Sequence, residues 1–209
     1  MRLIRILAIS GSLRRASTNS AVVRAVARLA SGPVHVTVYD ELELLPPFNP
    51  DVDENSADPV VARLRFHLGA AHGLVISSPE YAHGVPGVLK NALDWVVGSS
   101  ELAEKPVALI NASPRATHAW ASLAETLTVM SAHVVPEASI TLPLQGRSLD
   151  ALAIVEDPVL TPGDKPGHSY ACFYPFGTPE GDQALASNLS SGSNAAGLPM
   201  HLETEEVPV

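Results

Sequence analysis

The sequence has little cysteine and no long hydrophobic run. Its single cysteine, Cys172, cannot form an internal disulfide, which predicts a reducing, cytoplasmic location. No apolar run approaches the ~18 residues that a membrane span requires, so no membrane partner is expected. The apolar run at residues 1–9 is interrupted by Arg5 and lacks a small-x-small cleavage site, and we interpret it as a strand rather than a signal peptide. No metal site is expected, because His67 and His72 are five residues apart and do not share a helix face.

Basic residues are also scarce. The 209 residues include 13 Lys and Arg against 22 Asp and Glu, a net charge of −9, which argues against nucleic acid as a partner. Residues 157–209 contain seven of the acidic residues and one basic residue, so they carry −6 and leave −3 for residues 1–156. With 46% apolar residues, the chain has a globular composition, and its length fits one domain with or without an appendage.

Strand-like and helical patterns alternate along residues 1–156. The strand-like runs lie at 3–9, 34–39, 73–76, 106–111 and 133–138, the last as an edge strand that accommodates Pro136. The helical patterns lie at 21–30, 59–71, 88–96 and 123–130, and Leu149, Leu152 and Val155 predict a further short helix. The proline-rich segment 44–51 should run irregularly over the sheet edge. This alternation predicts an α/β domain with a doubly wound five-stranded parallel sheet, strand order 2-1-3-4-5, and a ligand crevice where the order reverses.

Residues 157–209 have a different composition. Seven prolines, six glycines and five serines make up about a third of this segment. Such a composition cannot recover its ordering entropy through burial, so the domain is expected to end near residue 156 and the acidic C-terminal tail to be irregular and largely disordered. An aromatic group points the other way, because it could dock on an apolar surface of the domain. This group is Tyr170, Phe173, Tyr174 and Phe176.

The loop after the first strand, residues 10–20, is rich in small polar side chains and leads into a helix for which Thr18 or Asn19 is the expected N-cap. Free N–H groups and the helix dipole favour an anion at such a helix start. Side chains that could add donors are Ser12, Arg14, Ser17, Asn19 and Ser20. The alternative is that these residues only cap the helix and close a turn, for which one or two of them would suffice. A phosphate site is therefore favoured, although neither a Gly-x-Gly-x-x-Gly nor a Gly-Lys-Ser/Thr motif is present.

The loop after the third strand, residues 78–87, contains two prolines, two glycines, a carboxylate, a tyrosine and an imidazole. In an open α/β sheet this loop lies at the carboxyl edge, where ligands bind. The alternative is a rigid turn in which the tyrosine is incidental. A third loop, residues 112–118, follows the fourth strand and should reach the same edge.

Two stretches resemble the NADPH-dependent FMN reductases, a family that includes flavin-dependent quinone, chromate and azo-dye reductases. They are Gly11-Ser12-Leu13-Arg14 with Ser17-x-Asn19, and the long, specific stretch Ser78-Pro79-Glu80-Tyr81-Ala82-His83-Gly84-Val85-Pro86-Gly87-Val88-Leu89-Lys90-Asn91-Ala92-Leu93-Asp94-Trp95. The resemblance covers about residues 3–156 and implies a flavodoxin-like fold with bound FMN. It implies that the FMN phosphate is surrounded by Ser10, Ser12, Arg14, Ser17, Asn19 and Ser20. It also implies that Pro79, Glu80, Tyr81, Ala82, His83 and Gly84 run beneath the isoalloxazine, which Ser113 approaches from the third loop.

The resemblance further implies a two-step oxidoreductase reaction. NADPH or NADH would give a hydride to FMN and leave, and a small-molecule oxidant such as a quinone, chromate, an azo compound or free flavin would then take the electrons. Because the flavin performs the chemistry, no side chain is assigned as catalytic acid, base or nucleophile, and Tyr81 and His83 are interpreted as pocket walls or interface contacts. The family commonly forms homodimers or homotetramers, with the helix near Pro86 and the Glu80-Tyr81 loop close to the interface. Family members usually end in a helix over the last strand, and this chain departs from them near Asp157.

Two alternative functions remain compatible with the sequence. A flavodoxin-like electron carrier would bind FMN but serve a protein partner, although the acidity lies mostly in the tail and the Pro79-Glu80-Tyr81 loop resembles the reductases. A degenerate relative would have lost its assembly and its flavin together with the terminal helix. The flavin spectrum of the purified protein, before and after addition of NADPH, separates the three.

Overall fold

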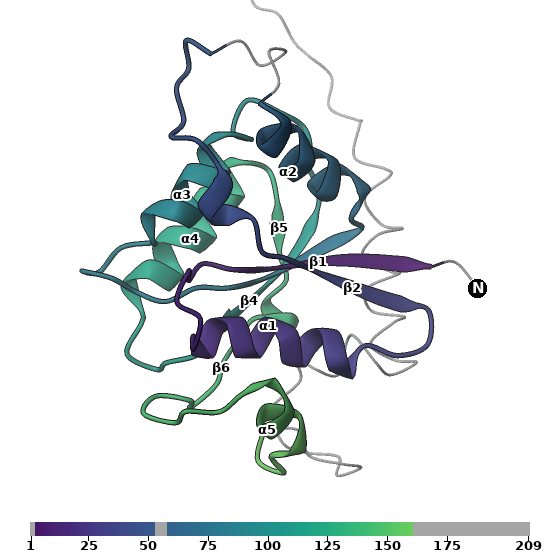
Figure 1. The fold of residues 1–209 in the computed structure, drawn as a ribbon, viewed down its shortest axis with the longest axis vertical. Coiled ribbons are helices and arrows are strands. Elements are labelled where there is room, and N and C mark those ends of the chain that lie inside the picture. The colour runs from purple at the N-terminus through teal and green to yellow at the C-terminus, as the bar shows by residue number, and fades with distance from the viewer. Residues whose placement is uncertain (1–2, 53–57, 161–209) are drawn as a thin grey trace, which may run out of the picture.

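Residues 3–52 and 58–160, which the computed structural model describes, fold around one parallel sheet of six strands (Figure 1). The strands are β1 (Ile4–Ser10), β2 (Val34–Tyr39), β3 (Gly73–Ser77), β4 (Pro106–Asn111), β5 (His133–Val134) and β6 (Ile140–Thr141). Their order is β2-β1-β3-β4-β5, and β6 also pairs with β4. The predicted order 2-1-3-4-5 is confirmed, and the sheet has one strand more than the five expected.

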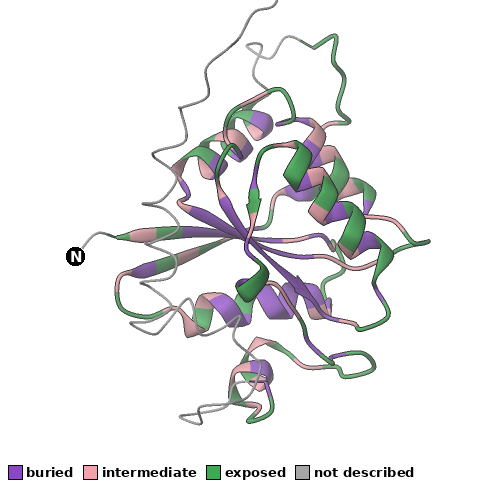
Figure 2. Cartoon of the chain, turned by 180° about the vertical axis from the view of Figure 1, so that it is seen from behind, coloured by how far each residue is buried: buried purple, intermediate pink, exposed green. Residues whose placement is uncertain are grey.

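Helices cover both faces of this sheet. They are α1 (Thr18–Leu29), α2 (Pro59–Ala70), α3 (Gly87–Asp94), α4 (His118–Val129) and α5 (Ala151–Glu156). Helices α1 and α5 pack on one face, and α2, α3 and α4 pack on the other (Figure 1). The central strands β3 and β4 are therefore buried along their whole length, whereas the outer faces of the helices are exposed (Figure 2). A membrane crossing would need a longer and more apolar helix than any in the described part of the chain.

Helix α1 begins three residues earlier than the apolar pattern from Ala21 indicated. The residue that caps it is Ser17, whose hydroxyl accepts a hydrogen bond from the Ser20 N–H at 3.4 Å. The prediction that Thr18 or Asn19 is the N-cap was wrong, because the extended backbone of a cap residue occurs at Ser17 and both later residues are already helical.

The last predicted strand, 133–138, is correct only for its first two residues. Strand β5 ends at Val134, and a 3-10 helix, η2, spans Pro136–Ala138 before β6 resumes the pairing with β4. Pro136 has no N–H to continue the ladder, which explains the interruption. In the gap, the Ser139 hydroxyl accepts the hydrogen bond of the Leu109 N–H at 3.1 Å, so this strand donor keeps a partner.

The predicted helix after the sheet is present as α5, but it begins at Ala151, so Leu149 precedes the helix rather than lying on it. Leu149 and Val155 pack against the core beneath α1, whereas Leu152 is 49% exposed and the neighbouring Ile154 is fully buried. Packing continues past residue 156, because Leu160 is also fully buried. Residues 161–209 lie outside the described residues, and with them lie most of the predicted tail, its aromatic group and Cys172.

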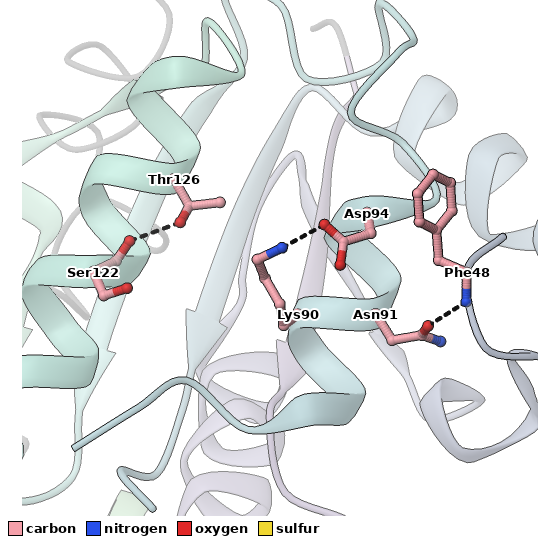
Figure 3. A network of polar contacts seen from close by, with 6 residues as sticks. All are labelled: Phe48, Lys90, Asn91, Asp94, Ser122 and Thr126. Carbon is pink, nitrogen blue, oxygen red and sulfur yellow. Dashed lines mark hydrogen bonds and ion pairs between the residues drawn. The ribbon is translucent and has the colours of Figure 1, made fainter. Parts of the chain in front are cut away.

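The connection after β2 begins with a short 3-10 helix, η1 (Leu42–Leu44), and then runs irregularly, as expected. It is anchored to α3 and the turn that follows it. The Pro46 carbonyl accepts hydrogen bonds from the side chains of Asn91, at 2.9 Å, and Trp95, at 2.8 Å. The Phe48 N–H donates to the Asn91 side-chain oxygen at 2.7 Å, as Figure 3 shows. This anchorage fixes α3, and hence the loop that precedes it, relative to the rest of the fold.

Candidate functional site

The loops after β1, β3 and β4 meet at the carboxyl edge of the sheet, as the topology predicts. They enclose a crevice of about 350 Å³. Four of the predicted site residues line it, namely Asn19, Pro79, Glu80 and Ser113. The segment 144–146, which follows β6, forms a further wall of the crevice.

The start of α1 presents hydrogen-bond donors to this crevice. Thr18 and Asn19 line the crevice and occupy the first two helical positions, where backbone N–H groups have no partner within a helix. The buried Ser77 hydroxyl donates to the Asn19 side-chain oxygen at 2.9 Å. The Asn19 side chain also carries an NH₂ group, which can donate to a ligand in the crevice. These donors, together with the helix dipole, suit a phosphate group.

The serines of the first loop are largely engaged with one another. The Ser10 and Ser20 hydroxyls are 3.0 Å apart, Ser10 accepts from the Ser12 N–H, and Ser12 accepts from the Arg14 N–H. Ser10, Ser12, Arg14 and Ser20 line a separate hollow of about 140 Å³ on the β2 side of the loop, and Ser17 caps α1. These hydrogen bonds shape the loop.

The first two loops touch at Gly11. A Cβ on Gly11 would lie 2.7 Å from the Ser78 hydroxyl oxygen and 3.1 Å from a Leu89 methyl. The glycine permits this close approach because it has no side chain.

The loop after β3 forms a tight turn beyond Glu80. Tyr81 and Gly84 exchange two backbone hydrogen bonds, at 3.1 and 2.9 Å. Between them, Ala82 and His83 have positive φ angles of 49° and 61°, the conformation of a type I′ turn. The lining of the crevice does not include Tyr81, Ala82, His83 or Gly84, all in the described part of the chain, and Tyr81 is 58% exposed.

Glu80 joins this loop to the next. Its carboxylate accepts a hydrogen bond from the Ala119 N–H at 2.8 Å, at the start of α4. The N-cap of α4, Thr117, makes no such bond with its own side chain, so Glu80 supplies the cap. The rings of His83 and His118 stack with their centroids 4.2 Å apart, which makes a second contact between the same two loops.

Sequence reasoning did not identify several residues that build the crevice. Asn111 ends β4, donates to the Ala116 carbonyl at 3.0 Å and accepts from the Ser113 N–H at 3.1 Å, which fixes the third loop. A polar residue at the end of a buried strand was the available clue to Asn111, and also to Ser77. No local pattern marks Gln145 and Gly146, since they reach the crevice only because β6 returns the chain to β4.

One buried polar group lies near the loops. The Tyr39 side chain lines the hollow beside Arg14, and its hydroxyl is buried without a hydrogen-bond partner among the described residues. Burial, and secondarily the Glu41 carboxylate, raise the pKa of Tyr39 to about 12. The phenol is therefore neutral at physiological pH.

The chain is similar to flavin-dependent reductases. Residues 4–146 match the family model described as NADPH-dependent FMN reductase. Over 159 residues the chain is 35% identical to an NAD(P)H-dependent FMN reductase of Pseudomonas aeruginosa, a match that covers 70% of this chain and 85% of that protein. Over 113 residues it is 34% identical to a quinone reductase of Escherichia coli, which covers 53% of this chain and 60% of that protein.

A solved structure of a flavoenzyme NAD(P)H:(acceptor) oxidoreductase from Paracoccus denitrificans matches with a TM-score of 0.56. The match has 21% sequence identity and covers 90% of this chain and 94% of the other. At this identity the likeness concerns the fold alone, and it agrees with the flavodoxin-like topology described above.

Proposed function

Because this chain belongs to the NADPH-dependent FMN reductase family, we propose that the crevice binds FMN and is the place where NAD(P)H is oxidised and a small oxidant is reduced. The protein is an FMN- and NAD(P)H-dependent oxidoreductase. The observation that carries the assignment of the crevice is the meeting of free donors at the start of α1 with the loops after β3 and β4.

We place the FMN phosphate at the start of α1. The backbone N–H groups of Thr18 and Asn19, the Asn19 amide and the Arg14 guanidinium would bind it. Support comes from the hydrogen bond of the Ser77 hydroxyl to the Asn19 side-chain oxygen, which fixes the orientation of this amide. Four serines would surround the phosphate and hold the loop in shape, namely Ser10, Ser12, Ser17 and Ser20.

We place the isoalloxazine between the loops after β3 and β4. Pro79 and Glu80 line one side of this part of the crevice and Ser113 lines the other. The turn formed by Tyr81, Ala82, His83 and Gly84 would lie at the outer end of the ring, as a rim. Because the Glu80 carboxylate is bonded to the Ala119 N–H, Glu80 would set the spacing of the two loops rather than transfer a proton.

Bound FMN supplies the redox chemistry, by accepting a hydride from NAD(P)H and passing two electrons to an oxidant. The protein binds and orients both partners, and no side chain is required as an acid, base or nucleophile. A quinone is the first oxidant to test, because the Escherichia coli relative is a quinone reductase. Chromate, azo compounds and free flavin are further members of the proposed oxidant class.

The test is a spectrum followed by kinetics. The purified chain, or the chain with added FMN, should show flavin absorption that bleaches on anaerobic addition of NADPH or NADH and returns on addition of a quinone. Bands that persist with both reductants would support an electron carrier. No bands even after addition of FMN would support a degenerate relative.

The order of events can be tested separately. If one crevice is used twice, initial rates measured against NAD(P)H at several quinone concentrations should give parallel double-reciprocal lines, the form of a ping-pong mechanism. Converging lines would show that both substrates bind together.

We further propose that the protein is a cytoplasmic homodimer or homotetramer. The supporting surface is the face formed by α3 and α4. A groove of about 280 Å³ lies there, between the Lys90–Asp94 ion pair of α3 and the hydrogen bond from the Thr126 hydroxyl to the Ser122 carbonyl in α4 (Figure 3). Val129, at the end of α4, lines this groove and is 73% exposed. Light scattering coupled to size exclusion should give a mass of two or four chains, and a monomer at micromolar concentration would contradict the proposal.

A further inference from the structure

Arg115 lies on the wall of the crevice that the loop after β4 forms. Asn111 accepts a hydrogen bond from the Ser113 N–H at 3.1 Å and donates one to the Ala116 carbonyl at 3.0 Å, so it fixes the loop on both sides of Arg115. The Ser113 hydroxyl accepts a further hydrogen bond from the Arg115 N–H at 3.3 Å. The backbone of Arg115 is thereby held at the crevice, and the residue is exposed.

The charge of Arg115 has no carboxylate partner. The charged residues in the lining of the crevice are Glu80 and Arg115, and the Glu80 carboxylate accepts the hydrogen bond of the Ala119 N–H at 2.8 Å. Among the residues that the structure describes, ion pairs within 4.0 Å do not include Arg115. Its guanidinium donors are therefore available to an anionic ligand in the crevice.

The FMN that we propose for this crevice does not account for this charge. Its phosphate is assigned to the start of α1 and to Arg14, and the isoalloxazine beside Ser113 is uncharged in its oxidised form. The other ligand of the crevice is the oxidant, and a planar aromatic oxidant can stack on the isoalloxazine. An anionic group on such an oxidant is the partner that the Arg115 guanidinium lacks.

We propose that Arg115 selects the oxidant, by binding the carboxylate or sulfonate group of an aromatic quinone. The enzyme then prefers anionic quinones to neutral quinones of similar size. This inference rests on the proposed function. A guanidinium suits these groups, because its planar donors bind two oxygens of one group at once. The anionic group itself does not react: NAD(P)H supplies a hydride, water supplies one proton, and the quinone becomes a hydroquinone whose sulfonate stays ionised.

The first test measures binding without turnover, on the oxidised, FMN-loaded chain. The probes are naphthalene sulfonate and its neutral sulfonamide, which have the same ring and are not oxidants. Calorimetry should show that the wild type binds the sulfonate about tenfold more tightly, as expected for a charge-assisted hydrogen bond. Arg115→Gln should remove most of this difference, and Arg115→Lys should keep part of it. Added salt should weaken the preference of the wild type, because Arg115 is exposed.

Arg28→Gln is the matched control. Arg28 lies on α1, is also exposed, forms no ion pair with the described residues and does not line the crevice. This variant should bind both probes as the wild type does.

The second test follows the oxidant half of the reaction alone. The FMN-loaded chain is reduced photochemically, so that NAD(P)H is absent, and is then mixed with naphthoquinone sulfonate or with the neutral quinone menadione. In Arg115→Gln, the second-order rate constant of flavin reoxidation should fall about tenfold for the sulfonate and stay unchanged for menadione. Because each oxidant is compared across variants, the different reactivities of the two quinones cancel.

Three results would overturn the proposal. The first is equal binding of the two probes by the wild type, or equal losses in Arg115→Gln and Arg28→Gln. The second is slower reoxidation of Arg115→Gln by both quinones, or weaker binding of FMN, since Arg115 would then act on the flavin. The third is a variant in which only the reaction with NAD(P)H is slowed. A wild type that binds no flavin, or whose flavin neither nucleotide reduces, would instead contradict the proposed function, and this result precedes the addition of any probe or oxidant.

Discussion

The hydrogen bonds of single residues determine which donors of the crevice loops can bind a ligand. The hydroxyls of the first loop bond to backbone N–H groups and to one another, and the phosphate site that we propose takes further donors from the start of α1 and from Arg14. Sequence composition pointed to this loop but could not show which donors stay free, because that depends on contacts with Ser77 across the sheet. The sequence therefore identified the polar residues of the first loop, but it could not predict which hydrogen bonds each of them makes.

The Arg14 assignment predicts a phosphate-specific loss. Arg14→Ala should weaken FMN binding by about 1.5 to 3 kcal/mol, because a charge-assisted hydrogen bond is lost. Riboflavin, which lacks the phosphate, should bind the variant and the wild type alike. Fluorescence titration with both flavins is the measurement. Equal losses for the two flavins would remove Arg14 from the phosphate site.

Tyr39 predicts a loss of stability at alkaline pH. The phenol titrates near 10 in the unfolded chain and at about 12 in the folded protein, so between these values the folded state retains a proton that the unfolded state has released. The free energy of unfolding should therefore fall as pH rises through this window, by at most about 1.4 kcal/mol per pH unit from this group. Denaturant unfolding at several pH values measures the slope.

Tyr39→Phe is the control for that slope. It removes the titrating group and a buried hydroxyl that has no partner among the described residues, so stability at neutral pH should be maintained or improved. Other groups titrate equally in both proteins. If the two proteins lose stability in parallel between pH 10 and 12, Tyr39 is not the cause.

At the scale of elements, strands and helices followed from periodicity, and the departures have local causes. The core strands β1 to β4 and the helices between them were predictable because their apolar patterns are long. The split of the last strand was not, since it depends on how Pro136 sits against β4 and on Ser139 filling the gap. The wall of the crevice at Gln145 and Gly146 was missed for the same reason, because it depends on β6.

The turn after Glu80 predicts a stabilising substitution. Ala82 holds a positive φ that favours Asn or Gly, and Asn is a preferred residue at this position of a type I′ turn. Ala82→Asn should raise the free energy of unfolding by about 0.5 to 1 kcal/mol. Thermal or urea unfolding detects this change.

Ala103→Asn is a matched control, because Ala103 is an exposed turn residue without a positive φ. It should give no gain. An equal gain at both positions would mean that backbone strain at Ala82 is not the source of the effect.

At the scale of the whole molecule, the sheet, its order and its crevice were predictable, whereas the far limit of the core was not. Composition placed the end of the domain near residue 156, yet Leu160 is fully buried and Asp157 pairs with Arg147. The sequence around Leu160 has no helical or strand-like periodicity, so its burial could not be predicted. Its place in the core is evident only from its packing with residues of α1 and α5.

The burial of Leu160 predicts that this residue, which lies beyond the expected domain end near residue 156, contributes strongly to the free energy of unfolding. Leu160→Ala should lower the free energy of unfolding by about 2 to 5 kcal/mol, as for a buried leucine that leaves a cavity. Leu152→Ala, on the exposed side of α5, should cost less than about 1 kcal/mol. Urea denaturation of the two variants makes the comparison. Similar costs would show that the core closes before Leu160.

The contact between Gly11 and Ser78 has a consequence for the speed of cofactor uptake. Because the two loops are in contact in the folded protein, the distance between the proposed phosphate and ring sites is set during folding. The loops therefore need little further ordering when FMN binds. Uptake should then be a single second-order event, with an observed rate that rises in proportion to FMN concentration and shows no plateau. A plateau would instead reveal a slow opening of the loops before the flavin can enter.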